Sequence, residues 1–218
     1  MPSTRPVDRP REALAIAKRY LRRERPLSAL IVVLAAAGFL GTFVATSLVP
    51  AVVVGVLLIV VARAPIIESR GTVRLRTDED AESVAESFTG PTPPILVFQW
   101  GITDEILTGD GTVTYRLSYL FGLRSVEVTV DTRTDRTPEG GRRIELELTV
   151  GGQPWSTYVV TVDKRGDGTV VKYEYTADRR FGLRRIPQRI VAKRYRDEAL
   201  EAQGFVVVER NEQYGVAI

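Results

Sequence analysis

The sequence predicts an α+β protein: an N-terminal two-helix transmembrane hairpin, then an antiparallel sheet domain that ends in a long helix. The segment 26–62 contains no charged side chain, although charged residues make up 26% of the 218-residue chain. From residue 71 onward apolar and polar residues alternate, a period of two that is typical of strands with one buried face. We therefore divide the chain into a basic amphipathic arm (1–25), a hairpin (26–67) and a cytoplasmic domain (71–218).

The basic arm is predicted to form a helix that begins after Pro10, because proline is well tolerated in a first helical turn. Leu14, Ala17 and Leu21 recur at helical spacing, and basic residues occupy another face. Such a helix can lie in a membrane interface, or it can be a solvated helix that leads into the hairpin. The basic residues expected at a membrane surface are Arg11, Lys18, Arg22 and Arg25.

The uncharged segment is too long for one membrane span. As a single helix its 37 residues would rise about 56 Å, whereas the hydrocarbon core is about 30 Å thick. Pro50 interrupts helical hydrogen bonding, which predicts two helices over about 27–47 and 50–67. Small residues such as Gly38 and Gly41 are predicted to face the second helix, and a dimer face is the alternative.

Basic residues flank the hairpin on both sides, which predicts a two-span cell-membrane protein with both termini cytoplasmic. The net charge is +6 over residues 1–70 and −3 over residues 71–218. A cleaved signal peptide and a buried hairpin of a soluble protein are alternatives. The apolar run exceeds the usual 7–15 or so residues of a signal peptide, and neither half has the polar stripe of a soluble helix.

The C-terminal domain is predicted to contain a sheet of about seven strands. Gly-rich turns separate the alternating segments, and glycine accepts the positive φ that tight hairpins need. Because the connections are short, the sheet is expected to be antiparallel. A final short strand, or an apolar tail packed back on the domain, is expected after Gly204. The clearest alternating segments are 112–121, 126–131, 143–150, 158–162 and 171–177.

Two predicted helices can cover the apolar face of this sheet. A short helix is expected to start at Thr77 or Asp78 and to end at about Phe88. A long helix is expected from about Arg184 to Gln203, with its apolar arc toward the sheet. The opposite arc is basic and is interpreted as a solvated face, with contact to anionic lipid headgroups as the functional alternative. This basic arc consists of Arg185, Arg189, Lys193 and Arg196.

This order of elements resembles the helix-grip fold of the START-like, polyketide-cyclase-like superfamily (SRPBCC). The segments that carry the resemblance are Gly71–Phe88, a strand followed by a short helix, and Phe181–Leu200, the closing helix. The resemblance covers about residues 71–203 and rests on element order. It implies a curved sheet wrapped around the long helix, with a cavity between them that in many members holds a hydrophobic ligand.

The residue types available limit the chemistry. The chain contains no histidine and no cysteine, which removes the usual proton shuttle, thiol nucleophiles, disulfides and ordinary zinc sites. It has neither a dinucleotide-binding nor a P-loop glycine motif, so no cofactor is expected. The acidic runs 78–80 and 104–105 are interpreted as a helix start and a strand end. No catalytic or metal-binding residue is therefore predicted.

Aromatic residues in the predicted strands and helices are the best indication of a ligand site, although they can also simply fill the core. The preferred hypothesis is a non-enzymatic, membrane-anchored domain that binds a hydrophobic small molecule or lipid. A cyclase or dehydratase-type enzyme and an accessory protein of a membrane complex are alternatives. Nucleic acid is not an expected partner. The predicted cavity-lining residues are Trp100, Tyr115, Tyr119, Tyr158, Tyr173, Tyr175, Val191 and Tyr195.

Overall fold

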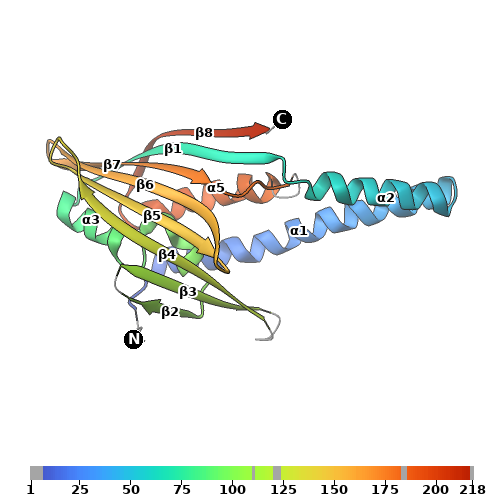
Figure 1. Ribbon diagram of the computed structural model, residues 1–218, viewed down its shortest axis with the longest axis horizontal. Helices are drawn as coiled ribbons and strands as arrows, with labels where there is room; N and C mark the ends of the chain where they lie inside the picture. Colours follow the sequence, from blue (N-terminus) through green and yellow to red (C-terminus); the bar gives the residue numbers. More distant parts are fainter. Residues whose placement is uncertain (1–6, 110, 120–123, 183–185, 217–218) are drawn as a thin grey trace.

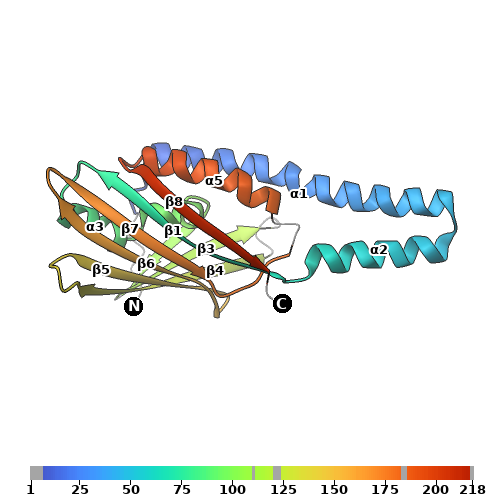
Figure 2. The same ribbon diagram turned by 90° about the horizontal axis from the view of Figure 1, so that it is seen from above.

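The computed structural model describes residues 7–109, 111–119, 124–182 and 186–216. A curved sheet and a layer of helices form the body of the protein, and a helical hairpin projects from one end of it (Figures 1 and 2).

The sheet has eight strands, all paired antiparallel, in the order β2-β3-β4-β5-β6-β7-β1-β8. The antiparallel arrangement predicted from the alternation is confirmed. The expected short last strand is instead eleven residues long and pairs with β1 along its length. The strands are β1 (Ile67–Thr77), β2 (Glu105–Thr108), β3 (Thr112–Tyr119), β4 (Arg124–Arg136), β5 (Arg142–Val150), β6 (Gln153–Arg165), β7 (Gly168–Ala177) and β8 (Val206–Val216).

The predicted glycine turns join neighbouring strands of this sheet. Gly151 and Gly152, between β5 and β6, have φ values of 58° and 74°, a conformation that residues with a Cβ rarely adopt.

Six helical segments accompany the sheet in the described part of the chain. The short helix α3 is capped by Asp80 rather than by Thr77 or Asp78, because Thr77 still belongs to β1. The Asp80 carboxylate accepts hydrogen bonds from the backbone of Glu82 and Ser83, both at 3.1 Å. The segments are α1 (Arg11–Ala45), α2 (Leu48–Arg63), α3 (Ala81–Thr89), the 3₁₀ turn η1 (Pro94–Leu96), α4 (Val97–Trp100) and α5 (Ile186–Glu201).

The first half of α1 is part of the body and lies beside α5 (Figure 2). Ala17 is fully buried, and the ring of Tyr20 stacks on Phe98 at 4.5 Å between centroids and lies 5.9 Å from Tyr195. The approach is close, since a Cβ on Gly101 would lie 2.7 Å from the Cβ of Ala17. The apolar stripe of the basic arm therefore packs on protein, which differs from both alternatives predicted for it, a membrane-interface helix and a solvated helix.

The predicted transmembrane hairpin is wrong. Among the described residues, no helix combines the length and the apolar character needed to cross a membrane. Helix α2 has 16 residues, which rise about 24 Å and fall short of the roughly 30 Å hydrocarbon core. Helix α1 runs without interruption from Arg11, so the charged arm and the uncharged segment share one 35-residue helix. The two-span topology and the cell-membrane location derived from it are withdrawn.

The hairpin that does form pairs the second half of α1 with α2. Its chain reversal lies at Thr46 and Ser47, while Pro50 sits in the first turn of α2, where a missing N–H breaks no helical hydrogen bond. Gly38 and Gly55 face the partner helix: added Cβ atoms would lie 3.3 Å from Leu58 and 3.1 Å from Phe39. An added Cβ on Gly41 would meet nothing within 4 Å, so only part of the small-residue face lies between the helices.

Candidate functional site at the polar end of the sheet

The inner face of the sheet, which is turned toward the helices, has two chemically different halves. Near α3 it is apolar and closed, with Val73, Leu75 and Val171 fully buried. The start of β1 is the end nearest the hairpin (Figure 1). At that end the inward positions of the sheet are polar. We call this region the polar end. Its members on the sheet are Ser69, Ser156, Tyr158, Tyr173, Tyr175, Arg210 and Glu212.

Three tyrosines on β6 and β7 form the floor of the polar end. Tyr173 is 1% exposed, and its hydroxyl has no hydrogen-bond partner among the described residues. The rings of Tyr158 and Tyr175 lie 6.1 Å apart. Tyr175 lies over Gly71 of β1, where a Cβ would come within 2.8 Å of its ring. The missing side chain of Gly71 thus makes room for the Tyr175 ring.

Two serines add further hydroxyls to the polar end. Ser69 and Ser156 are 1% and 5% exposed, and neither hydroxyl has a hydrogen-bond partner in the described part of the chain. Ser69 lies beside Tyr175 and helps to lower the pKa of that phenol, but it is outside hydrogen-bond geometry. Together with Tyr173, three buried hydroxyls therefore stand without a protein partner.

The phenols of Tyr173 and Tyr175 remain neutral near neutral pH. Burial raises the pKa of Tyr173 to about 12, with the positive charges of Arg196 and Arg210 opposing the shift. Burial also raises the pKa of Tyr175. Both hydroxyls are therefore available as hydrogen-bond donors.

Helix α5 brings arginine over these tyrosines. Arg196 is partly buried and lies close enough to Tyr173, Tyr158 and Tyr175 to interact with them electrostatically. It forms no ion pair or hydrogen bond within the described residues. Burial acts to lower its pKa, but the phenols and Glu212 outweigh that effect, so the pKa is raised and the guanidinium stays charged. Sequence reasoning placed Arg196 on the outer arc, whereas this part of α5 faces the sheet.

Arg210 ties β8 to α5 at the edge of the polar end. It is 6% exposed and forms ion pairs with Asp197 of α5 and, at 2.6 Å, with Glu212 of its own strand. Burial raises the pKa of Asp197, and Arg210 opposes this shift. Arg189 lies nearby, with its guanidinium 3.7 Å from the centroid of the Phe181 ring. Among the described residues Arg210 thus pairs directly with both carboxylates, and Arg196 pairs directly with neither.

Several predicted cavity residues belong to the closed core instead. Trp100 is fully buried and its Nε1 donates to the Pro93 carbonyl at 2.9 Å. The Tyr115 hydroxyl donates to the Pro91 carbonyl at 3.0 Å, and burial raises its pKa. Tyr195 packs on α1, and Val191 is partly buried. The side chain of Tyr119 lies outside the described residues. The structure thus brings together Tyr158, Tyr173 and Tyr175, but not the whole predicted set.

The basic residues predicted at a membrane surface fall into three groups. Arg11, Lys18, Arg22 and Lys193 are exposed. The side chains of Arg25 and Arg185 lie outside the described residues. Arg189 and Arg196 lie near the tyrosines of the polar end. Contact of any of them with lipid stays a prediction.

Sequence reasoning missed Ser69, Ser156, Arg210 and Glu212. The available signal was the continued alternation after Val207, which turns every second residue of β8 inward.

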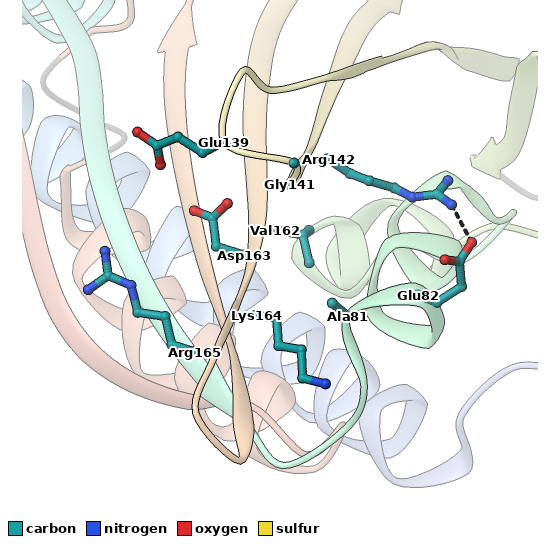
Figure 3. A pocket seen from close by; sticks show the side chains of 10 residues that line it. Ala81, Glu82, Glu139, Gly141, Arg142, Val162, Asp163, Lys164 and Arg165 are labelled. Atoms are coloured by element: carbon teal, nitrogen blue, oxygen red, sulfur yellow. Dashed lines mark hydrogen bonds and ion pairs between the residues drawn. The ribbon is translucent and has the colours of Figure 1, made fainter.

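A hollow of about 290 Å³ lies at the opposite end of the sheet between the start of α3 and the β4–β5 turn (Figure 3). Its lining charges are balanced: Glu82, Glu139 and Asp163 stand against Arg142, Lys164 and Arg165. Glu82 is paired with Arg142. Among the described residues no group of three acidic side chains is arranged to hold a metal ion. This hollow therefore has neither an excess charge nor the apolar lining of a ligand site.

The comparisons with known proteins give likeness of structure only. No family model matches the chain, and no curated protein matches it. Among solved structures, the Mll3558 protein from Rhizobium loti is similar at a TM-score of 0.40 and 23% identity, over 63% of this chain and 98% of its own. A conserved protein from Geobacillus kaustophilus has a TM-score of 0.39 and 17% identity, over 62% and 91%. CalU16 from Micromonospora echinospora has a TM-score of 0.32 and 23% identity, over 50% and 59%.

Proposed function

We propose that this protein is a non-catalytic binding module that holds an amphiphilic small molecule between the polar end of the sheet and α5. The observation that carries the proposal is the set of buried hydroxyls on Ser69, Ser156 and Tyr173, which have no partner among the described residues. Buried polar groups are normally hydrogen-bonded, and each unsatisfied one costs about 1–3 kcal/mol. A bound molecule that supplies the missing partners would remove that cost.

Partly buried apolar side chains on the inner face of the sheet and on α5 offer a surface for the rest of the molecule. Leu117 of β3 and Val126 of β4 pair in register and share the inner face with their buried neighbours Tyr115 and Val128. Both are only partly covered, as is Val191 on α5. An apolar surface that surrounds a few fixed polar groups is the usual composition of a small-molecule site. A long helix packed with an antiparallel sheet is also the arrangement that the START-like resemblance implies.

No specific observation favours the enzyme alternative. The two carboxylates described at the polar end, Asp197 and Glu212, are both paired with Arg210. A general acid or base needs a carboxyl group that can reach the substrate and exchange a proton with it. Membrane anchoring forms no part of the proposal, since the transmembrane hairpin is withdrawn.

Native mass spectrometry of the purified full chain, followed by organic extraction, tests this function. The full chain is needed because α1 packs into the body. We expect a non-covalent small-molecule adduct that disappears on denaturation and whose readdition raises the melting temperature. A ligand at 100 times its Kd stabilises by about 2.7 kcal/mol. A folded sample without an adduct, whose melting temperature does not respond to amphiphiles, would overturn the proposal.

A further inference from the structure

Building on this proposed function, we propose that the bound molecule carries an oxyanion, a carboxylate or a phosphate, which is held by the guanidinium of Arg196 and the hydroxyl of Tyr173. The inference rests on the binding function above and assigns the chemical class of the ligand headgroup.

The first support is the charge balance around Arg196. Arg210 pairs with both Asp197 and Glu212, and Arg196 has no ion pair among the described residues. A partly buried guanidinium loses hydration, and Arg196 offsets this loss through its electrostatic interactions with Glu212 and the phenols rather than through a direct ion pair. An anion beside Arg196 would give its guanidinium a direct partner.

The second support is the type of donor group present. A guanidinium presents its N–H groups in a planar fork that matches a carboxylate or a phosphate in two parallel hydrogen bonds. The hydroxyl of Tyr173 stays protonated near neutral pH and has no partner within the described residues, so it can add a third donor. A neutral headgroup such as an alcohol would leave the charge of Arg196 unbalanced.

The third support is the separation of polar and apolar surface at this end. The oxyanion would lie at Arg196 and Tyr173, with its apolar chain along the partly buried Leu117, Val126 and Val191. A molecule with one acidic headgroup and one apolar chain fits both surfaces at once.

Three probes with the same eighteen-carbon chain test the headgroup: oleate, oleoyl lysophosphatidate and oleyl alcohol. Binding to the full chain is measured by titration calorimetry below the micelle concentration, with inorganic phosphate and acetate as headgroup-only controls. We expect at least one charged probe to bind about tenfold or more tightly than the alcohol, the preference that one hydrogen bond to a charged group provides. Tight binding of oleate identifies a carboxylate as the bound group, and tight binding of lysophosphatidate identifies a phosphate.

Variants connect this preference to the named residues. R196Q should lower the affinity for the charged probe to that for the alcohol. R194Q is the matched control on the same helix, because the Arg194 side chain is 80% exposed and pairs only with Glu198 at 3.1 Å in the described structure. Y173F is a second variant that should keep the fold, since its hydroxyl has no protein partner to lose. It should weaken binding of the charged probe several-fold.

The possible failures are distinguishable. Equal affinity for the alcohol and the charged probes would overturn the oxyanion inference while the binding function stands. A charge preference that R196Q and Y173F leave intact would also overturn it. Binding of phosphate or acetate as tight as that of the matching amphiphile would show that the apolar chain plays no part. If no probe binds and the purified protein carries no adduct, the proposed function itself fails.

Discussion

Replacement of Arg210 by methionine should strongly destabilise the protein, because Arg210 joins β8 to α5 through Asp197 and also pairs with Glu212 of its own strand. Its side chain is 6% exposed, and its partners Asp197 and Glu212 are 31% and 9% exposed. Methionine fills the same apolar volume but leaves both carboxylates without their cation. Removal of one partner from a buried ion pair costs about 3–5 kcal/mol. Urea denaturation monitored by circular dichroism should show this loss in the free energy of unfolding.

An exposed ion pair elsewhere provides the matched control. Arg180 and Glu68 lie 3.0 Å apart, but both side chains are more than half exposed, at 54% and 53%. Exposed pairs contribute about 0–1 kcal/mol, so R180M should have little effect. If R210M and R180M cost the same, the ion pairs of Arg210 do not hold the sheet to the helix.

The pH dependence of R210M gives an independent check. Burial raises the pKa of Asp197, and Arg210 counteracts part of that rise. An acid with a raised folded-state pKa binds its proton more tightly when folded, so its contribution to stability is lost as the pH rises through that pKa. Without Arg210 the pKa of Asp197 should rise further. The deficit of R210M should therefore be smaller at about pH 5 than at about pH 7, and a deficit that grows on acidification would refute the reasoning.

Three further predictions test the packing and burial of individual residues. G71A should lower the free energy of unfolding by about 1–3 kcal/mol, because its Cβ would lie 2.8 Å from the Tyr175 ring. At Gly215 an added Cβ would meet nothing within 4 Å, so the control G215A should change stability by less than about 0.5 kcal/mol. Equal urea midpoints for the two variants would contradict this. Y20A should lower the free energy of unfolding by about 3 kcal/mol, because Tyr20 is 9% exposed and its ring packs between α4 and α5. An unchanged urea midpoint would show that α1 is not part of the core. Burial raises the pKa of Tyr173 to about 12, so this phenol should not ionise near about pH 10. The change in ultraviolet absorbance near about pH 10 should therefore be the same in Y173F as in the wild type, and a smaller change in Y173F would contradict the burial of Tyr173.

The sheet could be predicted from the sequence because a period of two maps directly onto burial. Ile144, Leu146 and Leu148 alternate with charged or polar residues, and all three are buried in β5. The antiparallel pairing followed from the short glycine turns. The sequence did not predict that the charged arm and the uncharged segment form the single helix α1. Helical hydrogen bonds join backbone groups, so a helix can continue across a change in side-chain charge. The partners of α1, such as Phe98, lie far away in the chain.

The candidate site was only partly visible in the sequence. Inward-facing Tyr173 and Tyr175 follow from alternation, but the position of Arg196 depends on which neighbour covers each side of α5. Tyr195 marks the side covered by α1, and that leaves the arc with Arg196 turned toward the sheet. A helical wheel shows which residues share a face but not what that face contacts. The contacts of α1, which is distant from α5 in the sequence, therefore determine which face of α5 is turned toward the sheet.

The residues of the polar end make the unliganded protein less stable than apolar residues at the same positions would. The other half of the inner face shows that this chain can close a sheet with apolar residues such as Leu75 and Val171. Within the described residues, the polar end has instead an arginine that forms no ion pair and three hydroxyls that have no hydrogen-bond partner. Each of these features costs free energy in the unliganded fold. Departures from good packing and pairing that gather in one place are typical of functional sites, where a bound group offsets their cost. A ligand oxyanion would partner the guanidinium and the Tyr173 hydroxyl together, and for this reason the polar end, rather than the charge-balanced hollow near α3, is where we place binding.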